Sequence, residues 1–227
     1  MADYKLEKLS GRTPLEVART PNMDNISSNG IMGVANTVPK NFKPGSDVAC
    51  LSVLGYNPAE YYTGRAPLES ASLGIELGEN DWAVRCNLIT ANEGILEDFS
   101  AGHVSDEEAK LIMSMLNDKF ADKNVKFYAG KSYRNIMVYS GDVTLEADCT
   151  PPHDIIGKPI TKNLPKGSGS EILFELMRDS FHLLENHEVN KVRLDLGENP
   201  ANMIWLWGQG KRPSLTPFKE LYGISGA

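Results

Sequence analysis

The chain has 227 residues, of which 41% are apolar and 23% charged, a balance that is ordinary for a protein with a hydrophobic core. Its formal charge of −7 and its pI near 5.2 argue against nucleic acid or an anionic membrane as the main partner, because both require a basic surface. No uninterrupted apolar run approaches the roughly 18 to 20 residues that a membrane-spanning helix needs.

The first quarter of the chain predicts two helices separated by a strand and a loop. Thr20-Pro21 is a helix start with Pro at the first helical position, and this helix should end at Asn29-Gly30. The run Ile31 to Val38 predicts a strand. The loop from Pro39 to Gly45 is rich in Pro and Gly, and it places Ser46 at the start of the second helix.

The middle of the chain predicts a helix followed by a hairpin. Ser105 and Glu108 form a capping box ahead of an apolar stripe at helical spacing, which indicates a helix. Val125 to Tyr128 and Asn135 to Tyr139 then predict two strands, joined by a turn at Gly130. We therefore expect a small α+β module here.

The last third predicts a return to a large core. Cys149 to Ser170 is rich in Pro, Gly, Lys and Ser and indicates a loop, after which an amphipathic helix begins near Ser170. The continuous apolar run Met203 to Trp207 suits a strand buried on both faces, as in a parallel sheet covered by helices. We therefore predict an α/β fold in which residues 1–85 begin a doubly wound core, residues 86–190 form an inserted α+β domain, and residues 191–227 return to the core.

Ser46 is the first residue that could carry chemistry. A serine after a glycine turn at a helix N-terminus lies beside unpaired backbone N–H groups, which can hold a phosphate or a developing oxyanion. Serine is also a favoured N-cap residue, so plain capping stays open. The surrounding Pro44-Gly45-Ser46-Asp47-Val48 is not a G-x-S-x-G elbow, so activation by a metal is the alternative to a catalytic triad.

Further side chains are candidates for contacts with an anionic ligand, and each has a simpler interpretation. His103 precedes the capped helix, where it either reaches a ligand or faces solvent. His153 and Asp154 follow two prolines, and this pair could orient a substrate, bind a metal or turn the chain. Arg85 lies in an apolar strand-like stretch, where it needs an anionic ligand or a structural ion pair. Arg65 and Lys211 complete the set of candidates.

Several ordered motifs carry a resemblance that spans essentially the whole chain. They are Gly11 to Asp24, Pro44 to Ala49, Leu54-Gly55-Tyr56, Tyr62 to Arg65, Arg85 to Leu88, Ser100 to His103, Pro151 to Asp154 and Pro200 to Asn202. Together they resemble the archaeal-type 2,3-bisphosphoglycerate-independent phosphoglycerate mutases of the alkaline phosphatase superfamily, a family whose bacterial branch includes proposed homoserine kinases.

The resemblance implies a phosphoserine mechanism. Ser46, held by one of two divalent metal ions such as manganese or magnesium, would take the phosphate of 3-phosphoglycerate and return it to the 2-hydroxyl group. Substrate binding would fall to Arg65, Arg85, His103, His153 and Asp154, with Lys211 as a further anion contact. The inserted domain would close over the catalytic half.

The two ends of the chain depart from the family pattern. The family begins with a strand that ends in a metal-binding Asp-Gly pair, whereas this chain opens with the polar stretch Met1 to Lys5. The family also continues past Ala227 with Asp and His residues that complete the metal site. We therefore expect a truncated chain with negligible activity alone, because the metal charges that would stabilise the transition state are incomplete.

The sequence is compatible with three functions. The first is a piece of a glycolytic phosphoglycerate mutase, and the second is a homoserine kinase-like phosphotransferase of the same family. The third is a non-catalytic binding module that another chain completes. The three widely spaced cysteines, without a C-x-x-C motif or a secretory segment, predict a cytoplasmic location. A small-molecule substrate is the expected partner, and a homo-oligomer is compatible with the sequence.

Overall fold

The computed structural model describes residues 4–225. The expectations about the two ends of the chain fall partly on residues 1–3 and 226–227, which lie outside the described range. The helices are α1 (Pro14–Val17), α2 (Pro21–Asn29), α3 (Ser46–Val53), α4 (Pro58–Tyr61), α5 (Arg65–Ser72), α6 (Asp106–Lys119), α7 (Ser170–Leu184), α8 (Glu188–Asp195) and α9 (Phe218–Tyr222). The strands are β1 (Trp82–Asn92), β2 (Ile95–Asp98), β3 (Val125–Lys131), β4 (Arg134–Tyr139) and β5 (Met203–Lys211).

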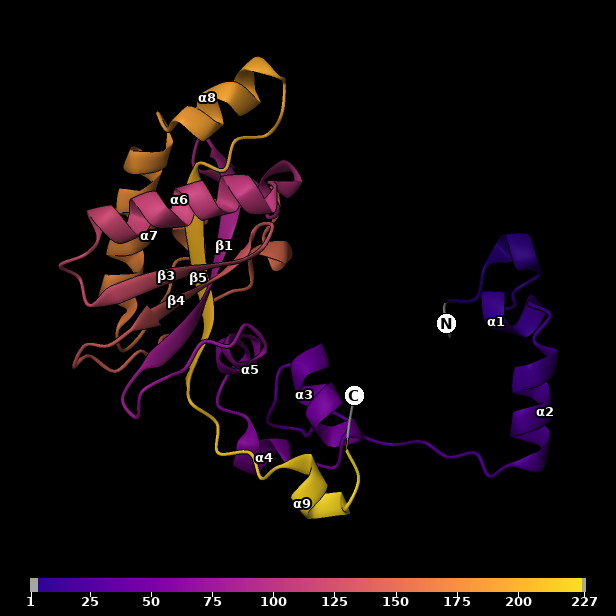
Figure 1. Cartoon of the computed structure of the whole chain (residues 1–227). Helices are drawn as coiled ribbons and strands as arrows, with labels where there is room; N and C mark the ends of the chain where they lie inside the picture. The colour runs from indigo at the N-terminus through magenta and orange to yellow at the C-terminus, as the bar shows by residue number, and fades with distance from the viewer. Residues whose placement is uncertain (1–3, 226–227) are drawn as a thin grey trace.

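The centre of the molecule is one antiparallel sheet in which every strand contacts the long β1 directly or through β4. β4 pairs with β1 on one side and β3 lies beyond it, while β5 pairs with β1 along residues 82–89 and β2 pairs with its last residues, 90–92. Helices α6 and α7 pack on β3 and β5, and α5 packs against β1 and β5. Figure 1 shows α6 and α7 beside the sheet, with α3, α4 and α9 gathered below its lower end.

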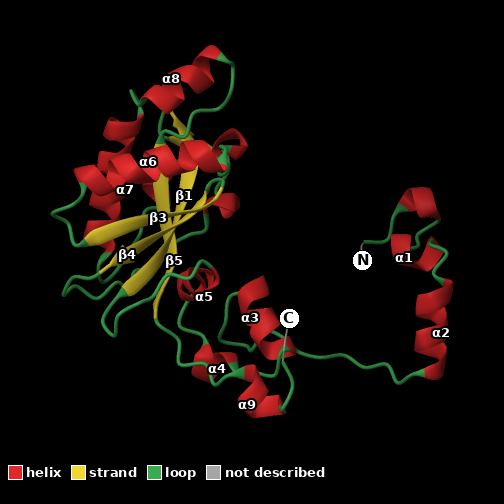
Figure 2. Ribbon diagram, in the orientation of Figure 1, coloured by secondary structure: helices red, strands yellow, loops and turns green. Residues whose placement is uncertain are grey.

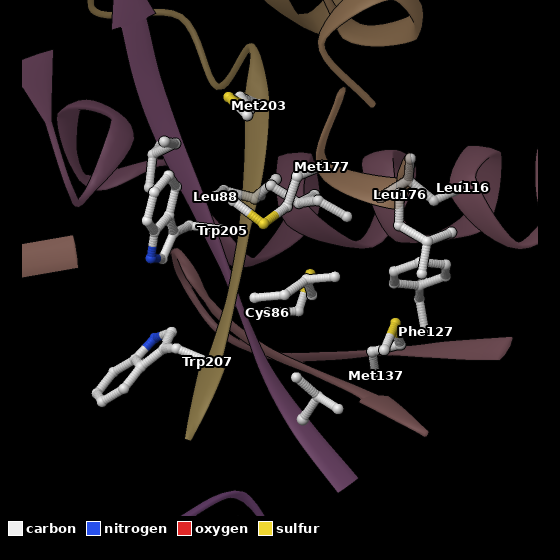
Figure 3. Close-up of a cluster of buried hydrophobic side chains, with 14 of the residues drawn as sticks. Cys86, Leu88, Leu116, Phe127, Met137, Leu176, Met177, Met203, Trp205 and Trp207 are labelled. Carbon is white, nitrogen blue, oxygen red and sulfur yellow. The ribbon is translucent and has the colours of Figure 1, made fainter. Parts of the chain in front are cut away.

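The hydrophobic core lies between the sheet and helices α6 and α7 (Figure 3). Val84, Cys86 and Leu88 alternate along β1, belong to this core and are fully buried. Leu116 of α6 and Met177 of α7 belong to the same core. Each lies four residues after another buried residue of its helix, as an apolar helix face requires. This packing joins the sheet and its two helices in one hydrophobic core.

The helix and strand predictions for the middle of the chain are confirmed. α6 begins with the predicted capping box, in which the Glu108 amide donates to Ser105 Oγ and the Ser105 amide donates to a Glu108 carboxylate oxygen. α7 begins at Ser170 as expected. The predicted hairpin is present as β3 and β4, but β3 continues through Gly130 and the turn falls at Ser132 and Tyr133.

The strand predicted at 203–207 is present, but its predicted parallel setting is wrong. β5 pairs antiparallel with β1, with Trp205 opposite Asn87 and Trp207 opposite Arg85. The run is apolar on both faces because α7 covers one face of β5 while the loop after Cys149 covers the other, where the Trp205 indole N–H donates to the Thr150 carbonyl. Burial on both faces therefore does not require a parallel sheet.

The strand predicted at 31–38 is absent. Residues 31–38 form no regular structure, and Ile31 and Val34 are fully exposed. A strand needs a neighbour to accept its backbone hydrogen bonds, and no described segment runs beside this one. Helices α1 and α2 bury no residue, and Figure 2 shows them standing apart from the sheet at the end of this extended segment.

Candidate functional site

A cleft of about 760 Å³ lies between the start of α3 and the loop that follows β4 in the chain. Its first wall comes from the loop before α3, from Ser46 and Asp47 at the start of α3, and from Tyr62 and Arg65 before and at the start of α5. Its second wall comes from the loop and turn at 149–154 and from Trp207 and Gly208 of β5. Segments separated by more than a hundred residues therefore meet at one surface.

Ser46 is the first residue of α3 rather than its cap. Gly45 occupies the N-cap position in extended backbone, so the capping alternative for Ser46 is not realised. The Ser46 side chain is exposed, and its hydroxyl makes no hydrogen bond within residues 4–225. The orphan amides of the first helical turn lie beside this hydroxyl, which is a setting that favours bound oxyanions.

Asp47 and Tyr62 form the polar pair next to Ser46. The Tyr62 hydroxyl donates a hydrogen bond of 2.5 Å to Asp47 Oδ2. Burial and then the bond to this carboxylate raise the pKa of Tyr62, so the phenol stays a neutral donor at physiological pH. The hydrogen bond therefore fixes the Asp47 carboxylate at the N-terminus of α3. The sequence analysis did not identify Asp47 or Tyr62 as site residues.

Arg65 and Arg85 share one carboxylate, that of Glu69. Arg65 Nε donates to Glu69 Oε1 at 2.9 Å, and Arg85 Nε lies 2.8 Å from Glu69 Oε2. Arg85 is only 3% exposed, and burial lowers its pKa against the opposing pull of Glu69. Of the two interpretations of Arg85 that the sequence allowed, the structural ion pair is present. Arg65 binds the same carboxylate.

The two histidines expected to bind substrate lie along a row of aromatic rings. His153 contacts the rings of Trp207 and Phe99, with ring centres 5.6 and 6.2 Å apart. Tyr133 stands between Phe99 and His103, and both contacts are edge-to-face. His153 lines the cleft, whereas His103 lies at the far end of the row and does not.

The other two predicted residues take different places. Asp154 lines the cleft beside His153, and its carboxylate lies 3.9 Å from the imidazole Nε2. Lys211 does not line the cleft: its ammonium group lies over the Trp82 ring at 5.4 Å. The structure therefore brings together Ser46, Arg65, His153 and Asp154, with Arg85 directly behind them.

The described residues do not form a metal centre by themselves. Residues 4–225 contain no group of three or more His, Cys, Asp or Glu side chains placed to hold an ion. The carboxylate of Asp47, the next residue in the chain, already accepts a hydrogen bond from Tyr62 at one of its oxygens. Ser46 and Asp47 alone would leave most of the coordination positions of a divalent cation to water or to further ligands.

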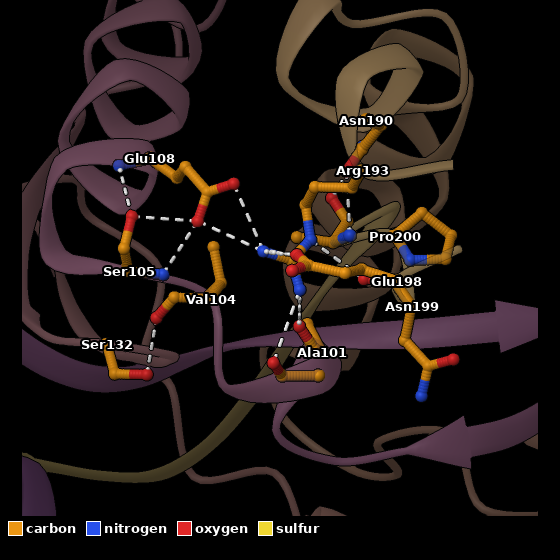
Figure 4. A network of polar contacts seen from close by, with 12 residues as sticks. Ala101, Val104, Ser105, Glu108, Ser132, Asn190, Arg193, Glu198, Asn199 and Pro200 are labelled. Atoms are coloured by element: carbon orange, nitrogen blue, oxygen red, sulfur yellow. Dashed lines mark hydrogen bonds and ion pairs between the residues drawn. The ribbon is translucent and has the colours of Figure 1, made fainter. Parts of the chain in front are cut away.

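A buried polar network stabilises the other end of the sheet (Figure 4). Arg193 of α8 is 2% exposed, and its guanidinium binds Glu108 at 3.0 Å, Glu198 at 3.1 Å and the backbone carbonyls of Ala101 and Asn199. The network anchors the loop that carries His103 to the start of α6. Its donors are satisfied, so its role is structural.

Known proteins match this chain along its whole length. A family model described as 2,3-bisphosphoglycerate-independent phosphoglycerate mutase matches residues 27–190. Proteins of that name from Methanosarcina mazei and Methanothrix thermoacetophila are 52% and 53% identical over all 227 residues. This chain spans 57% of the length of each of these relatives. Both names are those of mutases, and neither supports the kinase alternative.

Two solved structures share the fold. The PH0037 protein from Pyrococcus horikoshii is 27% identical, with a TM-score of 0.67, and the match covers 98% of this chain and 52% of that one. A cofactor-independent phosphoglycerate mutase from Thermoplasma acidophilum is also 27% identical, with a TM-score of 0.57 over 96% of this chain and 59% of that one. The chain belongs to the family of 2,3-bisphosphoglycerate-independent phosphoglycerate mutases.

Proposed function

We propose that this chain contributes the phosphate-accepting serine and part of the substrate site to a phosphoglycerate mutase that interconverts 3-phosphoglycerate and 2-phosphoglycerate in glycolysis. The observation that carries the proposal is the position of Ser46: exposed, at the N-terminus of α3, in a cleft that also contains Arg65 and His153. The family membership supports the same reaction.

The side chains at the cleft can account for the proposed phosphoryl transfer. Ser46 Oγ would lose its proton and form a bond to phosphorus as the bond from phosphorus to the 3-oxygen breaks, and that oxygen would take up one proton and leave as the hydroxyl of glycerate. The phosphoryl group would then pass to the 2-hydroxyl, which restores the serine. Arg65, Arg85, His153 and Asp154 would hold the substrate, and amides at the start of α3 would stabilise the charge on the transferred group. His103 would contact the substrate only if the far end of the aromatic row moved toward the cleft.

We propose that divalent metal ions, manganese or magnesium, belong to the full-length protein and that Ser46 is one of their ligands. The described residues alone do not fit such a site. The relatives contain further sequence, because this chain covers 57% of their length. We infer that the remaining ligands come from there.

We propose a domain division that differs from the one expected from the sequence. Because β5 pairs with β1, we propose that the inserted substrate-binding domain comprises residues 82–211, and that residues 4–81 and 212–225 belong to the catalytic core. The expected boundary at residue 190 would separate β5 from β1, its neighbour in the same sheet.

We also propose a cellular compartment and a partner for the protein. Among the described residues no helix is long and apolar enough to cross a membrane. The cysteines Cys50, Cys86 and Cys149 are all free, which supports a reducing compartment such as the cytoplasm. Phosphoglycerate is the proposed small-molecule partner.

The test is mutase turnover with added manganese, measured on this chain and on the same chain extended to the length of the relatives. We expect turnover in the extended protein and a loss of at least about a thousandfold in its Ser46→Ala variant. Ser52→Ala, in the same helix, is the matched control and should retain activity. Full turnover in the Ser46→Ala variant would refute the role of the serine, and no turnover in the extended protein would refute the mutase function.

A further inference from the structure

Glu69 holds two arginines from different parts of the fold. It lies one helical turn after Arg65 on α5, a spacing at which side chains share a face. Its two oxygens contact the Nε atoms of Arg65 and Arg85 at 2.9 and 2.8 Å. The carboxylate thereby links α5 to the central strand β1.

The contacts with Glu69 use only the Nε side of each guanidinium. No hydrogen bond among residues 4–225 involves an Nη atom of Arg65 or Arg85. For Arg85 the buried Nε atom has no hydrogen-bond partner within the described residues, although Glu69 Oε2 lies 2.8 Å away. Each arginine therefore retains its Nη edge, which is the edge that binds planar or tetrahedral oxyanions in a bidentate way.

Strand β5 also contacts both arginines. The guanidinium carbon of Arg85 lies 4.4 Å from the centre of the Trp207 ring, and that of Arg65 lies 5.7 Å from it. The next residue, Gly208, approaches the aliphatic stems of both: a Cβ built there would lie 3.5 Å from Arg65 and 3.6 Å from Arg85. Trp207 and Gly208 also line the cleft that contains Ser46. Arg65 also lines this cleft, and Arg85 lies directly behind it against the same ring.

A close backbone contact sets the position of α5. A Cβ on Gly64 would lie 2.2 Å from the Gln209 carbonyl oxygen, and one on Gly210 would lie 2.3 Å from the Thr63 carbonyl oxygen. Only glycines permit this approach. The Thr63 hydroxyl adds a hydrogen bond of 2.6 Å to the Lys211 carbonyl. The start of α5, and with it Arg65, is fixed against β5.

We propose that Glu69 is a positioning residue: it turns the Nη edges of Arg65 and Arg85 toward the cleft so that together they receive one oxyanion of the substrate. This inference rests on the proposed function for the identity of the substrate, phosphoglycerate. The oxyanion is either its phosphate or its carboxylate, which have the same chemistry toward a guanidinium. Within this group of three side chains, two guanidiniums and one carboxylate leave a net positive charge, which favours an anionic ligand.

A simpler role for Glu69, charge neutralisation, predicts an effect of opposite sign. If Glu69 only compensated two buried cations, its removal would leave more positive charge and would strengthen the binding of an anion. If it positions the arginines, its removal frees their side chains and weakens binding. The sign of the change therefore separates the two roles.

The experiment measures calorimetric affinities of the 227-residue chain for 3-phosphoglycerate, inorganic phosphate and glycerate. We expect Glu69→Gln to weaken the binding of 3-phosphoglycerate by about ten- to a hundredfold, because misplaced substrate contacts typically cost factors of this size. Glu76→Gln, an exposed carboxylate on the loop after α5, is the charge-matched control and should leave the affinity unchanged. A parallel loss for phosphate assigns the phosphoryl group to the pair, and a parallel loss for glycerate assigns the carboxylate.

Unchanged or tighter binding in Glu69→Gln would overturn the proposal, as would the absence of 3-phosphoglycerate binding by the unaltered chain. Should Glu69→Gln lower the thermal midpoint, Glu69→Asp retains the charge on a shorter side chain that cannot reach both Nε atoms. Glu69→Asp should still weaken the binding of 3-phosphoglycerate, and wild-type affinity in this variant would contradict the proposal.

In the extended protein, Glu69→Gln should raise KM more than it lowers kcat. If the extended protein shows no turnover but binding still depends on Glu69, the mutase function is refuted and the positioning role of Glu69 is not.

Discussion

Two helices of this protein begin with the same capping box but differ in length and in burial. In α1, Thr13 and Glu16 exchange hydrogen bonds, and in α6, Ser105 and Glu108 do the same. α1 has four residues, none of them buried, whereas α6 has fourteen and buries four residues against the sheet. The comparison shows that a cap selects where a helix begins, while the length and stability of the helix come from packing.

Backbone amide exchange should show the largest difference between the two regions. We expect the amides of β5 at 203–207 to exchange only on global unfolding, because they are buried in the central sheet. Those of 31–36 should exchange at nearly the rate of an unfolded chain. The two free energies should differ by at least about 5 kcal/mol. Equal protection would mean that residues 31–36 are covered in solution.

The second test removes a large side chain from each region. Trp205→Ala should lower the free energy of unfolding by about 3 to 5 kcal/mol, because the indole is 1% exposed and its N–H donates to Thr150. Ile31→Ala should change it by less than about 0.5 kcal/mol, since Ile31 is fully exposed. Denaturant unfolding followed by circular dichroism measures both. A large effect of Ile31→Ala would contradict the comparison.

The third test breaks the two capping boxes themselves. Ser105→Ala should cost about 1 kcal/mol of unfolding free energy, as expected for a cap whose helix is part of the cooperative core. Thr13→Ala should leave the global transition unchanged, because α1 buries nothing. Thermal melts of the two variants give the comparison, and equal shifts would show that α1 is coupled to the core.

The smallest expected effect is a dependence of stability on pH through Glu108. Burial tends to raise the pKa of this carboxyl, but hydrogen bonds from Ser105 and Arg193 outweigh it, so that the pKa lies below its ordinary value of 4.5. A depressed pKa in the folded state adds stability that is present above about pH 4.5 and is lost as the pH falls through the folded value. We expect thermal midpoints to fall below about pH 4.5 in the unaltered chain.

The pH dependence has a matched control in Glu108→Gln. This variant should be less stable at neutral pH and should show a smaller loss on acidification, because the carboxylate that titrates is absent. An identical pH profile in both proteins would place the acid sensitivity elsewhere, for example at Asp98, whose pKa is also lowered.

Local patterns predicted much of the candidate site. Ser46 at the start of a helix, Arg85 in need of a partner and the His153-Asp154 pair were all identified from residue type and local spacing, and all of them lie at or directly behind one cleft. Glu69 was missed, although its position four residues after Arg65 on a helix was a usable signal. Trp207 and Tyr62 carried no local signal, because their roles depend on segments more than ten residues away in the chain.

The amino-acid sequence alone determined where the helices of this protein begin, since caps, prolines and apolar stripes act over a few residues. Tertiary structure decided how the strands pair. An apolar run such as Met203–Trp207 buries both faces equally well in a parallel or an antiparallel sheet, and the run at 31–38 becomes a strand only beside a partner. The shared carboxylate of Arg65 and Arg85 was likewise decided by tertiary structure, because strand pairing and a glycine contact bring residues from α5, β1 and β5 to one place.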